Sequence, residues 1–452
     1  MTLTRYPPGS FRELWSIALP LMISSLSVMM MIFVDRLLLA HYSTEAMNAA
    51  VNAATFGWSF IGAWLVLGNI SEVFVAQYNG AGAKEKIGEP VWQMIWVALF
   101  SILFFVPMAF WGARLFYGDG PENGVIREYF KWMMLFGPTY PLYGALCGFF
   151  VGRGKTALIT ILAIIANLIN ALLDWVLIFG WKDWIPALGP IGASIATSGS
   201  NIFQAFVLLY VFLSYKNRET YGTGRFKLKM HALWQCLKIG SPGALFVGLE
   251  IMGFAVYYWL MTLVGEAYIT VAGICQSVVL LLYFFADGVS KAATTVAGNL
   301  IGAKREELIN DVLWSGVKMH VIFFFLMLGL FFVTSELIVH QFLPDATPET
   351  LDIIKNPLVM GLFFMVFYMF FEGVRLLFVG LLTAAGDTKF LLWGGALSIW
   401  LLFVLPIYLI VVLWHAPLIV GPLLCMLYSF VACAIYYWRF LSGKWKEIRL
   451  TT

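Results

Sequence analysis

Four carboxylates lie inside long apolar stretches of the chain: Asp35, Asp174, Glu250 and Glu372. A charged side chain near the centre of a bilayer costs about 2.5–3.5 kcal/mol on insertion scales, so such residues are rare and are commonly functional. The alternatives are a side chain that snorkels to the membrane surface or a purely structural ion pair. We therefore treat these carboxylates as candidates for binding an ion or a cationic ligand.

The first candidate site combines Asp35 with Asn170, Asp174 and Thr197. Asp35 lies 15 residues after Pro20, which is roughly 22 Å along a helix. Asp174 lies at a similar depth in the fifth apolar run, one turn after Asn170 on the same helix face, and Thr197 lies 7 residues after Pro190 in the sixth. These oxygens suit a monovalent cation such as Na⁺, and two close carboxylates equally suit a proton. The alternative is a buried hydrogen-bonded pair that only ties two helices together.

The second candidate site combines Glu250 with Glu372 and Tyr368. Both glutamates fall near the middle of their apolar runs, where neither side chain can easily snorkel to water. Tyr368 precedes Glu372 by four residues and shares its helix face. We expect this group to bind a coupling cation or a cationic substrate, although Arg375, three residues after Glu372, could neutralise it.

The remaining charges in or beside the apolar runs are expected to be structural. Asp287 and Lys291 are four residues apart and are predicted to form an ion pair. Glu72 is expected at the membrane surface. The five cysteines form no C-x-x-C pair and the five histidines are scattered, which gives no support for a metal cluster. The P-loop pattern requires glycine at position 149, where this chain has Phe149, so an ATP-driven pump is excluded.

The elements that must position these residues are membrane-spanning helices. Of the 452 residues, 61% are apolar and 12% are charged, whereas a soluble domain is nearer half apolar and a quarter charged. This composition excludes a nucleic-acid-binding protein and an ordinary soluble enzyme. Twelve apolar runs are long enough to span a bilayer: 14–39, 49–75, 91–113, 132–152, 156–180, 185–213, 239–264, 267–290, 312–334, 357–385, 390–414 and 416–438.

The distribution of the 28 Lys and Arg residues orients these spans. With the N-terminus inside, the large majority fall in the inner segments, as the positive-inside rule requires. An even number of spans places the C-terminus on the same side. We therefore expect a multi-pass protein of the cell (inner) membrane with both termini cytoplasmic.

The two halves of the chain repeat each other. Pro20 and Pro242 lie early in spans 1 and 7, and aligning Gly82-Ala83-Lys84 with Gly302-Ala303-Lys304 gives an offset of 220 residues. Span 4 closes with the sequence RGKT and span 10 with AGDT. Repeats with an even number of spans are related by an axis along the membrane normal. We predict an N-lobe (1–213), a cytoplasmic linker (214–238) and a C-lobe (239–452).

Several of these motifs resemble the multidrug and toxic compound extrusion (MATE) family of the MOP flippase superfamily. They are IALPLMISSLSVMMMIFVDRLLLA (17–40), the glycine-rich loop after span 2, RGKT (153–156), ANLINALLDWVLIFG (166–180), GPIGASIAT (189–197) and AAGDT (384–388). The resemblance covers nearly the whole chain. It implies an all-α membrane fold of twelve transmembrane helices, arranged as a V of two six-helix lobes.

The resemblance also implies roles for individual residues. The family's cation site matches Asp35, Asn170, Asp174 and Thr197 here, and bending of span 1 at Pro20 is implied to accompany ion binding. Glu250 and Glu372 are similar to acidic positions of the NorM-like branch, although aspartate is common at the second of them and a DinF-like assignment fits less well.

The implied function is secondary antiport rather than an enzymatic reaction. We expect export of cationic, aromatic drugs or metabolites in exchange for H⁺ or Na⁺, by alternating access, with no cofactor. The alternative is a lipid-linked precursor flippase or narrow-substrate exporter of the same superfamily. The expected partners are a small-molecule cation and the lipid bilayer, with no nucleic acid, and we expect a monomer.

Overall fold

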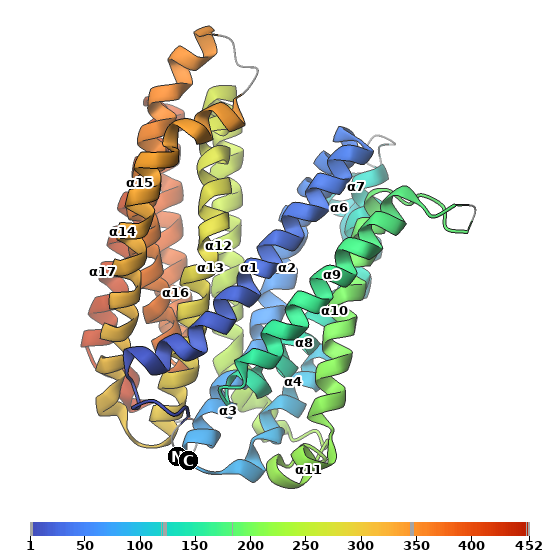
Figure 1. The fold of residues 1–452 in the computed structure, drawn as a ribbon, viewed down its shortest axis with the longest axis vertical. Helices are drawn as coiled ribbons and strands as arrows, with labels where there is room; N and C mark the ends of the chain where they lie inside the picture. The colour runs from blue at the N-terminus through green and yellow to red at the C-terminus, as the bar shows by residue number, and fades with distance from the viewer. Residues whose placement is uncertain are drawn as a thin grey trace.

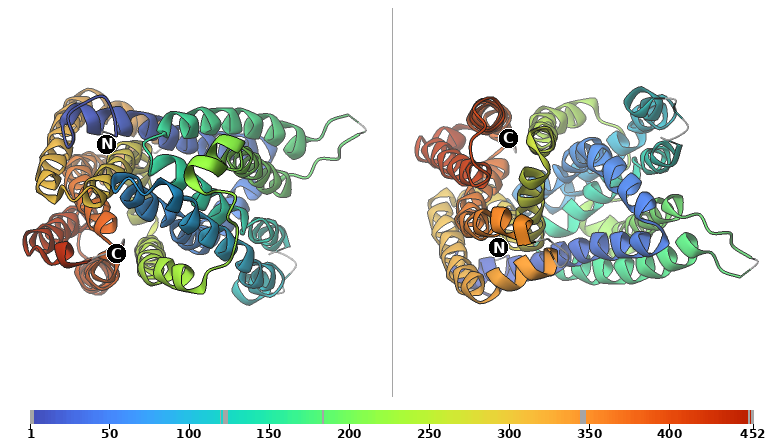
Figure 2. Two further views of the ribbon diagram at one scale, coloured as in Figure 1. Left: turned by 90° about the horizontal axis from the view of Figure 1, so that it is seen from below. Right: turned by 90° about the horizontal axis from the view of Figure 1, so that it is seen from above.

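The protein folds into two bundles of long helices that meet at one end and diverge toward the other (Figure 1). The structure is a computed structural model, and it describes residues 3–118, 120, 124–182, 184–343, 348–448 and 450. Both described ends of the chain lie where the bundles meet, which we call the terminal end, and the opposite end is called the far end (Figure 1). Figure 2 shows the molecule along its long axis from both ends, with the two chain ends apart from each other.

The helices of the N-lobe are α1 (Phe11–Tyr42), α2 (Thr44–Asn69), α3 (Ser71–Gly80), α4 (Gly88–Phe100), α5 (Ile102–Pro107), α6 (Ala113–Tyr117), α7 (Gly124–Leu135), α8 (Thr139–Val151), α9 (Thr156–Phe179) and α10 (Pro190–Phe212). The predicted linker, 214–238, contains α11 (Tyr215–Tyr221) and the first turns of the next helix, so the exact bounds of the lobes stay a prediction. The helices of the C-lobe are α12 (Met230–Val264), α13 (Glu266–Gly302), α14 (Ile309–Phe342), α15 (Pro348–Ala385), α16 (Thr388–Ile399) and α17 (Val420–Leu441). Short 3₁₀ turns η1 (Lys84–Lys86), η4 (Glu306–Leu308) and η7 (Lys444–Glu447), and the π-helical segments η2 (Met108–Gly112), η5 (Trp400–Val404) and η6 (Ile407–Leu413), complete the structure.

These helices have the length and the surface of membrane spans. Among the described residues, eleven helical segments are long and apolar enough to cross a bilayer, and the α7–α8 pair, bent by 40°, brings the number to twelve if it is one span. Large apolar side chains point outward, with Val333 81% and Leu103 77% exposed. Such surfaces are stable only against lipid. The predicted all-α membrane fold is therefore confirmed.

The structural repeat has a slightly different offset from the one read in the sequence. Gly82 has φ +74° and Lys304 has φ +58°, and η1 and η4 follow these two residues at the same spacing. Gly82 therefore corresponds to Lys304, an offset of 222 residues, and the alignment of Gly82 with Gly302 is shifted by two. Pro20 and Pro242 obey the same offset of 222.

The first helix of each half crosses to the other half. Helix α1 packs against α13 near the terminal end and against α9 further on, while α12 packs against α2. The residues of α1 before Pro20 thus belong to the junction, and those after Ser27 belong to the N-lobe.

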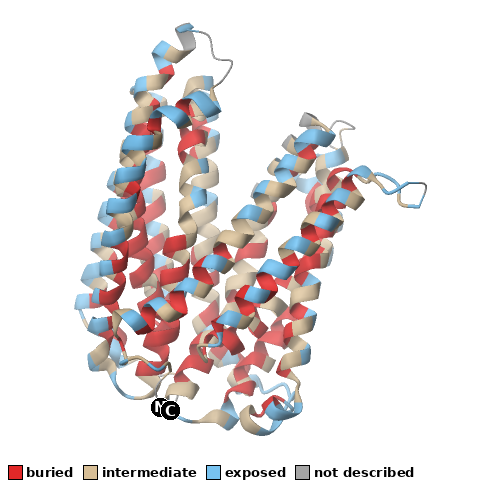
Figure 3. Ribbon diagram, viewed as in Figure 1, coloured by how far each residue is buried: buried red, intermediate tan, exposed pale blue. Residues whose placement is uncertain are grey.

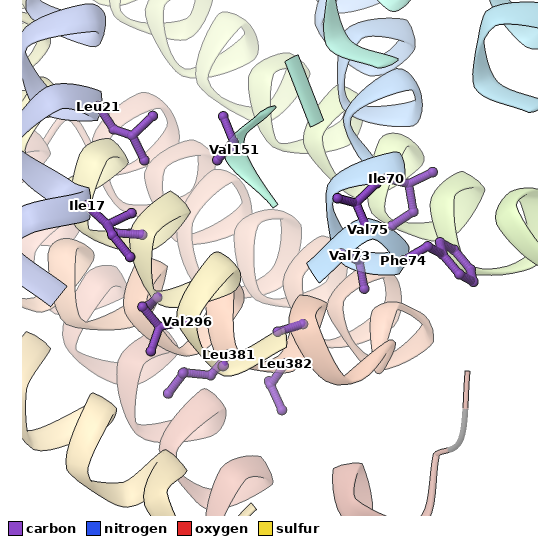
Figure 4. Close-up of a cluster of buried hydrophobic side chains, with 14 of the residues drawn as sticks. Ile17, Leu21, Ile70, Val73, Phe74, Val75, Val151, Val296, Leu381 and Leu382 are labelled. Atoms are coloured by element: carbon purple, nitrogen blue, oxygen red, sulfur yellow. The ribbon is translucent and has the colours of Figure 1, made fainter. Parts of the chain in front are cut away.

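The largest apolar core fills this junction at the terminal end. Figure 4 shows Ile17 and Leu21 of α1 with Val296 of α13 and Leu381 of α15, and the same core includes Val73 of α3. Buried residues are concentrated where the bundles meet and along their inner faces, and exposed residues lie on the outside (Figure 3). One continuous core therefore joins the lobes at this end.

Three glycines let α8 approach α2 and α3 closely. Gly144, Gly148 and Gly152 recur at four-residue spacing on α8. A Cβ atom at Gly148 would lie against the Ser71 hydroxyl and 2.7 Å from the backbone nitrogen of Glu72. Small residues in this pattern let helix backbones pack tightly inside a membrane.

We expect Gly148→Ala to destabilise the protein by about 1–3 kcal/mol, because the added methyl group has no room. The measurement is the thermal unfolding midpoint of purified protein in detergent. The matched control is Gly273→Ala on α13, where an added Cβ would meet no atom within 4 Å. Equal midpoints for the two variants would contradict this account of the α8 packing.

Candidate cation site

The N-lobe candidate site lies between three helices, α1, α9 and α10. Asp35 comes from α1, Asn170 and Asp174 come from one face of α9, and Thr197 comes from α10. Asn170 and Asp174 are fully buried. The structure thus brings together all four side chains that the sequence placed at a similar depth, while their role in binding an ion stays a prediction.

Hydrogen bonds connect these residues but leave most of their oxygens without a donor. The Thr197 hydroxyl lies 3.1 Å from Asp35 Oδ2 and 3.0 Å from the Ala193 carbonyl, and Asn170 Nδ2 lies 3.5 Å from Thr197 Oγ1. The carboxyl groups of Asp35 and Asp174 adjoin each other. Among the described residues, no hydrogen-bond donor reaches Asp35 Oδ1, Asn170 Oδ1 or either oxygen of Asp174.

This arrangement is an unsatisfied group of acceptors inside a membrane protein. An ionised carboxylate can only accept hydrogen bonds, so two of them cannot bond to each other without a proton between them. A buried charge is costly unless it is paired or coordinated. The four acceptor atoms therefore suit either a proton shared by the carboxylates or a small cation held by carboxylate and amide oxygens.

Sequence reasoning missed two tyrosines beside this group. Tyr129 and Tyr140 lie on α7 and α8, which pack against α10, the helix that carries Thr197. Both come from the bent span, whose aromatic residues look like ordinary lipid-facing or packing residues in the sequence. No spacing rule in the sequence distinguishes them from the other tyrosines.

Pro20 lies inside the continuous helix α1, at the point where α1 passes from the junction to the N-lobe. Its carbonyl oxygen accepts a hydrogen bond of 2.6 Å from the Thr160 hydroxyl of α9. Because proline has no backbone N–H, the turn before it lacks one helical hydrogen bond. The backbone of α1 is therefore weakest at Pro20. The role of Pro20 as a hinge stays a prediction.

In the C-lobe candidate site, Arg375 holds both glutamates. Its guanidinium donates two hydrogen bonds to Glu372, at 2.8 and 2.5 Å, and one of 2.6 Å to Glu250 on α12. The side chain of Arg375 is 1% exposed, and the rings of Phe246 and Tyr436 flank it. The sequence indicated the contact with Glu372, but the contact with Glu250 depends on how α12 packs against α15.

Arg375 changes what the second site can do. With both glutamates ionised the group carries one net negative charge, and a further cation would have to share the carboxylates with the guanidinium. Tyr368 lines a neighbouring cavity of about 40 Å³ together with Tyr257, and no described hydrogen bond joins its hydroxyl to either glutamate. The cation-binding role of Glu250, Tyr368 and Glu372 stays a prediction.

A further polar group joins the two lobes at their junction. The predicted pair forms, with Lys291 Nζ 2.7 Å from Asp287 Oδ2, and Ser25 of α1 donates a hydrogen bond of 2.5 Å to the same oxygen. The expected position of Glu72 at the membrane surface stays a prediction. Its carboxylate accepts a hydrogen bond of 2.8 Å from Thr295 of the C-lobe. The crossing of α3 with α13 leaves Glu72 half-buried, and the sequence does not show which helices cross.

Among the described residues, no three His, Cys, Asp or Glu side chains lie close enough together to hold a metal ion. The N-lobe group, with two carboxylates, an amide and a hydroxyl, has the oxygen ligands of a weakly bound monovalent ion rather than those of a resident metal.

Comparison with known proteins gives a consistent result. The sequence pattern of the MatE family matches residues 20–176 and 244–409. A probable multidrug resistance protein NorM from Thermotoga maritima is 25% identical, with 98% of this chain and 95% of that protein aligned. The multidrug resistance protein MdtK of Photorhabdus laumondii is 23% identical, with 86% and 85% aligned.

Solved structures share the fold. A multidrug resistance MATE family transporter of the MOP superfamily, in an outward-facing conformation, superimposes with a TM-score of 0.83 over 98% of this chain and 97% of that one, at 16% identity. A mutant of a MATE transporter from Vibrio cholerae gives a TM-score of 0.81 over 96% and 98%, at 17% identity.

We expect Arg375→Met to destabilise the protein by about 3–5 kcal/mol, because it leaves the buried Glu372 and the half-buried Glu250 without their counter-charge. The measurement is again the unfolding midpoint in detergent. In the control, Arg225→Met, the lost partner is Glu85 at 3.7 Å on the surface, with both side chains more than 70% exposed, so the effect is expected to stay below about 1 kcal/mol. An Arg375→Met protein as stable as this control would contradict the neutralising role of Arg375.

Proposed function

The chain belongs to the MatE family, so it is a transporter and not an enzyme, and on that premise we propose that it is a secondary antiporter. It exports cationic, aromatic drugs or metabolites in exchange for a proton or a sodium ion. Relatives that align with most of the chain are named multidrug resistance proteins, which supports drugs as cargo. The aromatic content of 17% provides rings for cation–π contact with such cargo.

The observation that carries the proposal is the donor-free group of oxygens in the N-lobe. Asp35, Asn170 and Asp174 present four buried acceptor atoms that no described donor reaches. A group of this kind gains most from taking up a cation, because the ion removes the cost of the buried carboxylates. The coupling ion therefore binds in the N-lobe, through Asp35 and Asp174, with Asn170 and Thr197 as further oxygen ligands when the ion is sodium.

Exchange proceeds by alternating access between two lobes, 1–213 and 239–452. The excess of lysine and arginine in the segments at the terminal end supports a cytoplasmic position for both termini in the inner membrane. On that orientation the lobes diverge outward, and the conformation drawn in Figure 1 is the one that releases cargo and admits the ion. Exchange of one singly charged cargo for one proton or sodium ion moves no net charge, so the concentration gradient of the coupling ion drives that cycle. The membrane potential adds about 2.3 kcal/mol per 100 mV only for each unit of net charge that moves inward.

Helix α1 transmits the state of the ion site. Asp35 lies toward the far end of α1, while Ser25 on the same helix bonds to Asp287 of the C-lobe. Neutralisation of Asp35 changes how α1 is held against α9 and α10. Pro20 provides the weak turn at which α1 bends in response.

The C-lobe site acts on cargo rather than on the coupling ion in this proposal. Its net negative charge attracts a cation, and Arg375 keeps the two glutamates from binding a bare ion tightly. The alternative, a flippase for lipid-linked precursors, requires free positive charge for an anionic headgroup. The engagement of Arg375 by both glutamates argues against it.

The proposal predicts gradient-driven export that depends on Asp35 and Asp174. Purified protein in liposomes is given ethidium and either a proton gradient or a sodium gradient. Wild-type protein is expected to move ethidium with one of the two gradients, and Asp35→Asn or Asp174→Asn is expected to lower the rate to that of empty liposomes. The gradient that works identifies the coupling ion.

The matched control is Asp352→Asn, which removes an exposed aspartate of α15 and is expected to leave transport unchanged. Full coupled export by folded, correctly inserted Asp35→Asn protein would falsify the proposed ion site. If wild-type protein moves ethidium under neither gradient, the cargo is a narrower metabolite or a lipid-linked precursor.

A further inference from the structure

At the terminal end, α3 and α13 cross with their backbones in contact. Each helix carries two small residues four positions apart, Ala76 and Gly80 on α3 and Gly298 and Gly302 on α13. A Cβ atom on Gly80 would collide with the Asn299 carbonyl oxygen, and one on Gly302 would collide with the Gln77 carbonyl oxygen. One on Gly298 would lie 2.7 Å from the Ala76 methyl carbon. This is the small-xxx-small packing that brings membrane helices together most closely.

Side-chain amides reinforce this crossing in a reciprocal way. Gln77 Nε2 of the N-lobe donates a hydrogen bond of 2.8 Å to the carbonyl of Ala384 in the C-lobe. Asn299 Nδ2 of the C-lobe donates one of 2.9 Å to the carbonyl of Gly152 in the N-lobe. Ala384 lies in the last turn of α15 and Gly152 caps the end of α8, and carbonyl groups at helix ends have no helical partner.

The two hydrogen bonds are related by the internal symmetry of the fold. Asn299 lies 222 positions after Gln77, the same offset that relates the turns after α3 and α13. Helices related by a two-fold axis along the membrane normal run parallel, and contacts between equivalent elements can form only close to that axis. The crossing of α3 and α13 therefore lies on the pseudo-two-fold axis.

One contact breaks the symmetry. Asn79 Nδ2 donates a hydrogen bond of 2.7 Å to Asn299 Oδ1, and the residue equivalent to Asn79 in the C-lobe is Ile301, which cannot reciprocate. The Asn299 amide nitrogen also contacts the Thr295 carbonyl at 2.8 Å. Asn299 is thus bonded on both sides of its amide, and the crossing depends on it more than on Gln77.

We propose that this crossing is the latch that closes the terminal end, and that Gln77 and Asn299 set the balance between the two orientations of the transporter. The inference rests on the proposed alternating access, because only then must the contact break. Helices α3 and α13 both end at the crossing, at the extremity of the molecule. Rotation that closes the far end must separate them there.

The chemistry of the latch suits repeated opening. The hydrogen bonds of Gln77 and Asn299 are neutral amide bonds, which are individually weak and exchange readily for bonds to water. The Glu72 carboxylate of α3, which accepts from the Thr295 hydroxyl of α13, can bond to water in the same way when the helices separate. The ion pairs that cross no lobe boundary, such as Arg439 with Asp387 at 2.7 Å, are much stronger and hold each lobe together. The lobes therefore separate at the amides while each stays intact.

The test measures the distance across the terminal end by spin-label spectroscopy in lipid nanodiscs. Labels are placed at exposed Lys86 and Asn310, in the segments that follow α3 and α13. Gln77→Met and Asn299→Leu remove the donors while nearly preserving volume. Each is expected to raise the population of the longer distance about fivefold, the effect of losing one neutral hydrogen bond, with the larger effect for Asn299→Leu.

Gly302→Ala perturbs the latch without removing a donor, because the added methyl group wedges the helices apart, and it is expected to shift the distances in the same direction. The matched control is Asn201→Leu, which removes a buried amide that bonds to Thr139 within the N-lobe, and it is expected to leave the distances unchanged.

Unchanged distances in folded Asn299→Leu and Gly302→Ala protein would overturn the proposal and make the crossing a fixed pivot. The measurement uses no drug and no ion gradient. A failure of ethidium export would therefore leave its result intact, and a failed latch would leave the ion-site test intact.

Discussion

The cost of burying charge in hydrocarbon is the constraint around which this molecule is organised. At the C-lobe site and at the terminal end, arginine meets the constraint directly, through Arg375 between two glutamates and Arg439 on Asp387. At the junction, the Ser25 hydroxyl and Lys291 both bond to the Asp287 carboxylate. Only in the N-lobe do two adjoining carboxylates have three oxygens, Asp35 Oδ1 and both of Asp174, that no described donor or cation reaches. Because the other buried carboxylates have partners and this group does not, the N-lobe group suits reversible binding of an ion.

The N-lobe site lies on α1, a helix that also contacts the C-lobe, so an ion bound there can affect both lobes. Asp35 belongs to α1, the helix that begins against the C-lobe and ends in the N-lobe. Ser25 and Asp35 are ten residues apart, about 15 Å along the helix. Pro20 weakens the turn where the helix changes partners. A change of charge at one end of α1 therefore acts on the junction, where the apolar core, the hydrogen bonds to Asp287 and Glu72, and the amide hydrogen bonds keep the lobes together.

Much of the fold and part of the site could be predicted from the sequence because the depth of a residue in the membrane follows from its position along an apolar run. Apolar runs define the spans, and counting residues along them placed Asp35 and Asp174 at one level, where the structure brings them into contact. Lateral packing is not encoded in that way. Nothing in the sequence indicates that Glu72 bonds to Thr295 of the other lobe, or that Glu250 faces Arg375, 125 residues away. The repeat shows a related limit. The sequence favours matching Gly82 with Gly302, because both are glycines. In the structure, however, the equivalent residues of the two turns are Gly82 and Lys304, which both have a positive φ, a conformation that lysine rarely adopts.

The central claim is that cargo and coupling ion exchange for one another at charged groups inside the protein. The most direct measurement is ion release on cargo binding, made by adding ethidium to purified protein in weakly buffered solution and recording proton and sodium activity. The account predicts release of one ion species from wild-type protein and a loss of that release in Asp174→Asn protein that remains folded. Binding of ethidium without release of either ion, or undiminished release from the variant, would contradict it.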